Sequence, residues 1–175
     1  MITEIDTNIP QSTNDRIIDL LMNSNGWYFG QDNHDRENNF KNPDAGFTLM
    51  TYHEDPKNIP ILNPQVDAFG WFIFDIVKEK YHLKFRSVNR IFWNFYNKNS
   101  VMGFHIDRPE DRAYSIIYNF TNNDGGTNFR VKEDEVIFKK SIASQALVFP
   151  SKLFHTGVAP KNSNNRMALN IVAWL

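Results

Sequence analysis

The chain has 175 residues, a formal net charge of −1 and 41% hydrophobic residues, which indicates a globular protein rather than a disordered one. It contains no cysteine, so disulfides, thiolate metal sites, iron–sulfur clusters and cysteine nucleophiles are excluded. The balanced charge gives no overall basic field for nucleic acid or an anionic membrane. The N-terminal residues lack the basic and apolar regions of a signal peptide, and no apolar stretch would span a bilayer, so we expect a soluble cytoplasmic protein.

Two helices and a short strand are predicted before residue 82. Apolar residues at helical spacing within 15–24 predict the first helix, with Thr13 or Asn14 as its N-cap. The run "GWYFG" at 26–30 is typical of a strand between glycines. Asn63 and Pro64 favour the start of a second helix, which we expect to reach Tyr81. Its expected buried stripe is Val66, Phe69, Ile73, Ile76 and Val77.

Residues 31–62 between these elements are polar and irregular in sequence. A loop of this length in a compact domain is usually functional, so we interpret it as a mobile lid. His34 and His53 lie in this segment and His82 ends the second helix; each is interpreted as a solvated or capping side chain.

After residue 85 the sequence consists of short β-rich runs separated by polar turns. Eight such runs favour a jelly-roll sandwich or barrel. We therefore predict one α+β, mainly β domain over residues 1–175, with helices on one outer face. Residues 1–87 would form the helical support and lid, and residues 88–175 the core. The predicted strands are Val88–Tyr96, Val101–Ile106, Arg112–Phe120, Thr127–Val131, Val136–Lys139, Ala146–Phe149, Phe154–Ala159 and Arg166–Trp174.

The first of these strands alternates strictly. Ile91, Trp93 and Phe95 form an apolar face that suits packing under the helices. The opposite face carries Asn94 and Tyr96 toward the barrel interior. Because a polar group in a core needs a partner, a bound ligand is one way to provide it.

The stretch "GFHIDR" contains a histidine and an aspartate that would share one face of a strand, either as metal ligands or as a solvated edge. His155 is the candidate third ligand, 48 residues after Asp107 on the seventh predicted strand. A jelly roll brings its second and seventh strands together. His105, Asp107 and His155 would then form the facial triad that is diagnostic of non-haem Fe(II) oxygenases.

The ordered pattern "FHID…SIIYNF…DGGTNF…FPSKLFHTGVAPKNSNNRMALNIVAW" resembles the core of the 2-oxoglutarate/Fe(II)-dependent dioxygenases. It is most similar to their prolyl 4-hydroxylase-like branch. The resemblance covers residues 88–174, and it implies a double-stranded β-helix, the cupin-like form of the jelly roll.

The resemblance implies a role for each matching residue. His105, Asp107 and His155 match the iron ligands. Arg166 lies eleven residues after His155 and matches the residue that pairs with the distal carboxylate of 2-oxoglutarate. Tyr118 matches a tyrosine that assists the same carboxylate, with a core aromatic as the alternative. Asn94 and Tyr96 lie where several subfamilies contact the cosubstrate, and packed strand residues are the alternative there.

The implied activity is oxidative decarboxylation of 2-oxoglutarate to succinate and CO2, coupled to hydroxylation of a C–H bond by O2. Fe(II) and 2-oxoglutarate are the implied cofactors, and ascorbate is used by many related enzymes. The sequence leaves oligomeric state open.

A peptidyl prolyl residue is the leading expectation for the substrate. Alternatives are a free amino acid or small metabolite, AlkB-like nucleic-acid demethylation, and a non-catalytic jelly-roll binding module. The sequence ends one residue after Trp174, which leaves no room for the second arginine of the AlkB type. For the same reason we expect substrate selection by residues 27–62, the Arg108–Arg112 loop and the rim.

Overall fold

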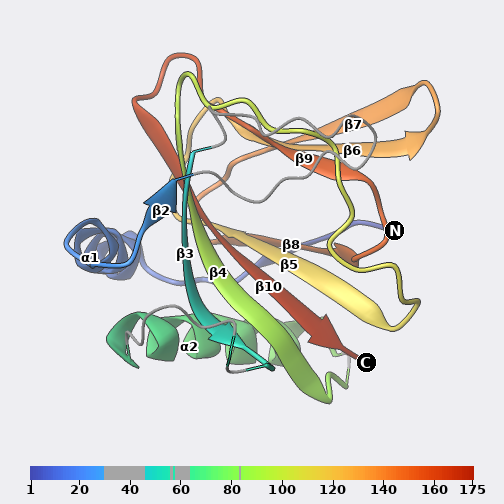
Figure 1. Cartoon of the computed structure of the whole chain (residues 1–175), viewed down its shortest axis with the longest axis horizontal. Helices are drawn as coiled ribbons and strands as arrows, with labels where there is room; N and C mark the ends of the chain where they lie inside the picture. The colour runs from blue at the N-terminus through green and yellow to red at the C-terminus, as the bar shows by residue number, and fades with distance from the viewer. Residues whose placement is uncertain (30–45, 56, 58–63, 83) are drawn as a thin grey trace.

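A computed structural model describes residues 1–29, 46–55, 57, 64–82 and 84–175. Two antiparallel sheets face each other, and two helices cover the outer side of the larger sheet (Figure 1). This arrangement confirms the predicted α+β, mainly β class with helices on one face.

The larger sheet has the spatial order β1-β8-β5-β10-β4-β3-β2, and the smaller sheet has the order β7-β6-β9. The large-sheet strands are β1 (Thr3–Asp6), β2 (Tyr28–Phe29), β3 (Phe47–His53), β4 (Ser87–Asn97), β5 (Ala113–Asn119), β8 (Gln145–Pro150) and β10 (Asn165–Trp174). The small-sheet strands are β6 (Gly126–Lys132), β7 (Glu135–Lys140) and β9 (His155–Val158). The helices are α1 (Gln11–Met22) and α2 (Pro64–Tyr81).

The larger of two hydrophobic cores lies between the helices and the large sheet. Ile91 and Trp93 of β4 are fully buried there, as the alternation of that strand predicted. Gly70 lets α2 approach closely, because a Cβ at this position would lie 2.7 Å from Cγ2 of Ile91. Strand β10 is buried along almost its whole length, since it pairs with β4 and β5 in the middle of the sheet.

A smaller core fills the space between the two sheets. Ile117, Phe129, Leu147, Phe149 and Ala168 form it. The polar face of β4 also turns toward this space, because its alternate residues must face away from the helices. The interior between the sheets therefore combines an apolar part with a polar part.

The predicted second helix is confirmed from Pro64 to Tyr81, with Val66, Ile73 and Val77 fully buried. The first helix begins earlier than predicted, at Gln11, and Pro10 is its N-cap without a side-chain bond. The predicted cap at Thr13 or Asn14 is therefore wrong. Asn14 is instead buried within α1, where its amide serves tertiary contacts.

Two other expectations need correction. Part of the predicted lid is a strand, because Phe47–His53 pairs with β4 and buries Leu49 completely. The rest of the predicted lid lies mostly outside the described residues, and only 46, 54, 55 and 57 of it are described. The predicted strand Val101–Ile106 does not form; it contributes one isolated bridge, between His105 and His155.

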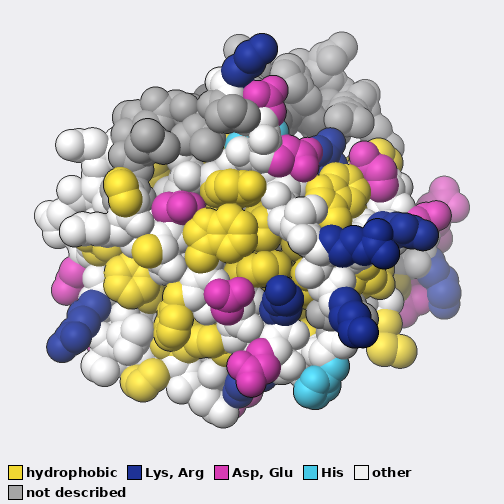
Figure 2. Space-filling model, turned by 90° about the horizontal axis from the view of Figure 1, so that it is seen from below, with side chains coloured by type: hydrophobic (Ala, Val, Ile, Leu, Met, Phe, Trp, Pro, Cys, Tyr) yellow, Lys and Arg dark blue, Asp and Glu magenta, His cyan; other side chains and the backbone are white. Residues whose placement is uncertain are grey.

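No described helix is both long enough and apolar enough to cross a membrane. Figure 2 views the molecule from below, the side on which α2 lies in Figure 1. Apolar side chains on this face are interspersed with acidic and basic ones.

Candidate metal centre

A pocket opens between the two sheets, on the polar face of β4. Its walls come from β4, β5, β6, β9 and β10, together with the segment that carries His105. The lining residues are Phe92, Asn94, Tyr96, His105, Ile117, Thr127, His155, Gly157, Arg166, Ala168 and Asn170.

The two histidines of the predicted triad are held together by backbone bonds. The amide of each donates to the carbonyl of the other, both at 2.9 Å. Each ring also places Nδ1 near the carbonyl two residues earlier, 3.1 Å for His105 with Gly103 and 3.0 Å for His155 with Leu153. When Nδ1 carries the proton and donates to that carbonyl, Nε2 of each ring presents a lone pair.

Asp107 reaches the same place through a bend rather than a strand. Its amide donates to the carbonyl of Ser151 at 3.0 Å, which fixes the segment against the loop before β9. Nη2 of Arg90 donates to Oδ1 at 2.6 Å, and Ser115 Oγ donates to Oδ2 at 2.5 Å. Burial alone would raise the pKa of Asp107, but His155, Arg90 and His105 together hold it below its usual range.

The arrangement fits a bound cation. The ligand atoms of His105, Asp107 and His155 all lie within 4.8 Å of one another. Nε2 of His155 is 3.5 Å from Oδ2 of Asp107, is buried, and has no hydrogen-bond partner among the described residues. Burial lowers the pKa of His155 to about 4, although Asp107 acts in the opposite direction, so the ring is neutral at pH 7. Two lone pairs facing a carboxylate are stabilised by a divalent metal, and this donor set suits iron.

Arg166 occupies the end of the pocket near Tyr96 and Gly157. Its side chain is 1% exposed, and Nη2 donates to Asn119 Oδ1 at 3.2 Å and Thr127 Oγ1 at 3.3 Å. Its guanidinium stacks on the ring of Tyr96, 5.3 Å from the centroid. Burial lowers the pKa of Arg166.

Two donors at this end of the pocket have no acceptor among the described residues. They are Nε of Arg166 and Nδ2 of Asn119. A buried cation beside two unpaired donors is unfavourable unless an anionic acceptor binds. The residues at this end of the pocket therefore fit a carboxylate.

The remaining predicted cosubstrate residues divide into two groups. Asn94 and Tyr96 both line the pocket, and Thr48 donates to Asn94 Oδ1 at 3.2 Å. Tyr118 does not face it: the side chain belongs to the helix-side core, and its hydroxyl donates to Asn14 Oδ1 at 2.6 Å. The predicted role of Tyr118 is therefore wrong, because even-numbered residues of β5 face the helices.

The other histidines lie apart from this site. Nδ1 of His53 accepts a hydrogen bond from the amide of Asp55 at 3.0 Å, a local capping contact. His82 is exposed just after α2, and His34 lies outside the described residues. Among the residues that the structure describes, the triad is the one group of three potential metal ligands.

Several residues of the site were not predicted from the sequence: Asn119 and Thr127 beside Arg166, and Arg90, Ser115 and Asn170 around Asp107. All three around Asp107 contact its carboxylate, with Asn170 Nδ2 at 3.4 Å from Oδ2. A signal for Ser115 and Asn119 was available, because they alternate with Ile117 on one face of β5.

Solved structures share this fold at low sequence identity. An oxidoreductase of the 2OG-Fe(II) oxygenase family from Burkholderia pseudomallei aligns with 99% of this chain and 84% of its own, at 12% identity and a TM-score of 0.70. A prolyl hydroxylase from Trichoplax adhaerens, in complex with a hypoxia-inducible-factor peptide fragment, aligns with 99% and 83%, at 14% identity and 0.67. A Pseudomonas putida prolyl-4-hydroxylase aligns with 99% and 91%, at 11% identity and 0.61.

No protein-family model and no curated protein sequence matches the chain. The structural neighbours are 2-oxoglutarate/Fe(II) oxygenases, and prolyl hydroxylases are among them. The chain thus has the double-stranded β-helix fold of these oxygenases and carries a His-Asp-His group within it.

Proposed function

We propose that this protein is an Fe(II)- and 2-oxoglutarate-dependent dioxygenase that hydroxylates a C–H bond of its substrate. One observation carries the proposal: three potential metal ligands and a buried arginine with an unpaired donor line or border the same pocket. Shared fold supports it but does not define activity, because one fold hosts many functions.

In this proposal His105, Asp107 and His155 hold Fe(II), and Arg166 holds the distal carboxylate of 2-oxoglutarate with help from Asn119 and Thr127. Tyr96 and Asn94 border the cosubstrate. Bound iron would supply the activation of O2, with one oxygen atom entering succinate as CO2 leaves 2-oxoglutarate and the other entering the C–H bond of the substrate.

The chain's own residues would orient the reactants. Backbone bonds between His105 and His155 fix both rings, and the Nδ1 contacts fix the tautomer that presents Nε2. Arg90 and Ser115 orient the Asp107 carboxylate and keep it ionised. The partly apolar space between the sheets would limit the access of water.

A peptidyl residue, with proline first, is the proposed substrate. The support is the sequence resemblance to the prolyl 4-hydroxylase-like branch and the neighbour that was solved with a peptide fragment. A cytoplasmic location and a benefit from ascorbate stay predictions of the sequence.

Succinate release tests the activity. The purified protein is incubated with Fe(II), 2-oxoglutarate, O2 and proline-containing peptides, and we expect succinate together with a peptide product that is heavier by one oxygen atom. His105→Ala should remove both products, because the metal would lose one of three protein ligands. His82→Ala is the matched control, since His82 is exposed just after α2 and is not among the residues that line the pocket.

Equal succinate release by wild type and His105→Ala would contradict the triad. Succinate release without a modified peptide would support the oxygenase reaction but contradict the prolyl substrate. The same assay would then be repeated with free amino acids.

A further inference from the structure

Asn170 places an amide in the middle of the pocket wall. It lies on β10 opposite Phe92 of β4, lines the pocket and is 5% exposed. Its Nδ2 faces Oδ2 of Asp107 at 3.4 Å, whereas its Oδ1 is buried and has no partner among the described residues. The opposite orientation of the amide would place Oδ1 of Asn170 against Oδ2 of Asp107, and both atoms are acceptors. The orientation is therefore fixed, and Oδ1 of Asn170 is the atom that needs a donor.

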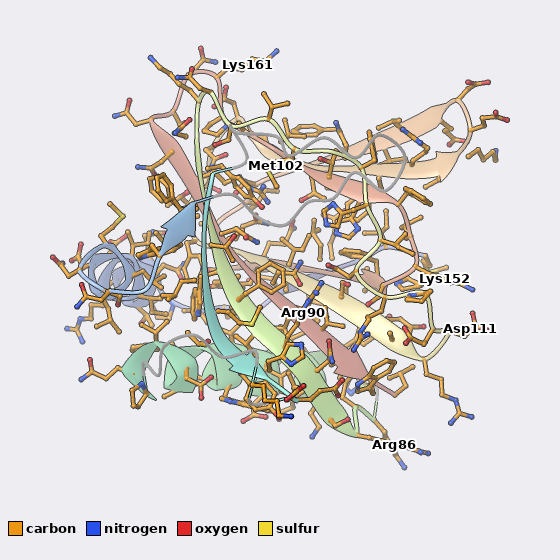
Figure 3. The ribbon with its side chains drawn as sticks, viewed as in Figure 1. Arg86, Arg90, Met102, Asp111, Lys152 and Lys161 are labelled. Atoms are coloured by element: carbon orange, nitrogen blue, oxygen red, sulfur yellow. The ribbon has the colours of Figure 1, made fainter. Side chains whose placement is uncertain are left out.

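Arg90 lies on the other side of the same carboxylate. It shares the inner face of β4 with Phe92, over whose ring its guanidinium lies at 5.0 Å, and it contacts Oδ1 of Asp107. Figure 3 shows Arg90 extending from β4 into the middle of the molecule, whereas Arg86 points away from it. The side chain is 26% exposed, and its buried Nε has no partner in the described part of the chain.

These two unpaired groups have opposite character, and 2-oxoglutarate cannot satisfy both. The ionised cosubstrate offers only acceptors, so it has no hydrogen for Asn170 Oδ1. The partner of Asn170 must donate, and the partner of Arg90 must accept. A secondary amide carries one N–H donor and one carbonyl acceptor on adjacent atoms, and it bears no charge that would need neutralising.

We propose that Asn170 and Arg90 bind a secondary amide of the substrate, with Asn170 accepting its N–H and Arg90 donating to its carbonyl. The inference rests on the proposed function, because it assigns these residues to the substrate of the same site. It defines the substrate as a peptide or another N-acyl compound with an N–H close to the oxidised carbon. For a prolyl substrate, that amide is the one that follows the proline.

Two small ligands test the inference without turnover. N-acetylproline methylamide carries the N–H, and N-acetylproline dimethylamide lacks it. Each is titrated into the protein by calorimetry, without O2, in the presence of 2-oxoglutarate and Mn(II) in place of iron. We expect the methylamide to bind about 3- to 10-fold more tightly, the value of one hydrogen bond.

Variants of Asn170 and Arg90 show which residue causes the preference for the methylamide. Asn170→Leu should bind both ligands equally, because it removes the acceptor and keeps the size of the side chain. Arg90→Lys should weaken both ligands, since it keeps the charge beside Asp107 but loses the planar fork. Arg86→Lys and Asn99→Leu are the matched exposed controls and should retain the wild-type preference. Mn(II) affinity and the unfolding midpoint verify that each variant keeps a folded site.

Three results would overturn the inference: no binding of the methylamide, equal binding of both ligands to the wild type, or a preference that survives in Asn170→Leu. The wild-type comparison decides even where a variant does not fold. Succinate release is measured separately on the wild type. If the wild type prefers the methylamide but releases no succinate, the proposed oxygenase activity is wrong and the amide site stands. If it releases succinate but shows no preference for the methylamide, the amide site is wrong and the oxygenase activity stands.

Discussion

Six side-chain atoms in the described part of the chain are buried without a hydrogen-bond partner, and five of them belong to this pocket and its border. Nε of Arg166 and Nδ2 of Asn119 lie at one end, and His155 Nε2, Arg90 Nε and Asn170 Oδ1 surround Asp107 at the other. Because an unpaired buried group costs about 1–3 kcal/mol, this clustering indicates groups that are paired by a ligand or by water in the pocket.

At the residue scale, Arg166 provides a test of the cosubstrate end. Arg166→Lys keeps a positive charge but removes the planar fork that binds a carboxylate through two hydrogen bonds. We expect the KM for 2-oxoglutarate to rise about tenfold or more, the value of one charge-assisted bond. Steady-state succinate release measures it, with the exposed Arg86→Lys as control. An unaltered KM would remove Arg166 from the cosubstrate site.

Tyr118 gives the opposite expectation, because its hydroxyl bonds to Asn14 on the helix side. Tyr118→Phe should leave the KM for 2-oxoglutarate unchanged. It should also reduce the free energy of unfolding by about 1–3 kcal/mol, because the buried Oδ1 of Asn14 loses its donor. Urea denaturation and succinate assays on the same sample measure both, and a raised KM with normal stability would restore the role predicted from the sequence.

At the element scale, the loop before β10 is held by Asp124. Its carboxylate accepts hydrogen bonds from the backbone amides of Lys161, Asn162 and Ser163 at 3.0, 2.9 and 3.3 Å. These bonds connect the turn before β6 to the loop that leads into β10, the strand that carries Arg166. The Asn162 amide is the largest cause of the lowering of the Asp124 pKa to about 2.

This depressed pKa predicts an acid-dependent contribution to stability. The unfolded chain binds the proton near the ordinary value of 3.8, so the contribution is present above that pH and is lost as pH falls through about 2. Wild type should be more stable than Asp124→Asn at about pH 6, and the difference should shrink toward about pH 2. Urea unfolding across this range measures it, and a difference that is independent of pH would exclude the carboxylate contacts.

Gly70 tests the contact between α2 and the sheet. Gly70→Ala adds a methyl group 2.7 Å from Cγ2 of the fully buried Ile91. Overpacking lowers the free energy of unfolding by about 1–3 kcal/mol, whereas the better helix propensity of alanine raises it by about 1 kcal/mol. We therefore expect a net loss of stability. The same substitution in an Ile91→Ala background should cost less or stabilise. An equal loss in both backgrounds would show that the close contact is not the cause.

The alternation of side chains between the two faces of a strand explains which elements the sequence could predict. The alternation of β4 is strict, so its two faces were predicted correctly, down to Ile91 and Trp93 against the helices. Strand β5 is buried on both faces, with Ile117 in one core and Tyr118 in the other, so its composition does not distinguish them. Tyr118 was assigned to the pocket from the family resemblance, and the composition of β5 gave no signal that its neighbour Asn119 faces the pocket instead.

At the scale of the whole molecule, the sequence predicted the fold class and the three residues that converge, but not how they converge. His105 and Asp107 were expected on one strand, whereas a single bridge and a bend place them. The bridge joins residues 50 positions apart, and the bend depends on Ser151, so neither leaves a local pattern in the sequence. Strand β1 was missed for the same reason, because four residues that pair with β8 carry no periodic signal.

The most direct test of the central claim is the position of a metal in crystals grown with Mn(II), located by anomalous scattering. The account predicts one strong peak per chain, within about 2.0–2.3 Å of His105 Nε2, His155 Nε2 and one oxygen of Asp107. It also predicts that the peak disappears in His105→Ala crystals prepared in the same way. A peak elsewhere, or none between these three side chains in well-ordered wild-type crystals, would contradict it.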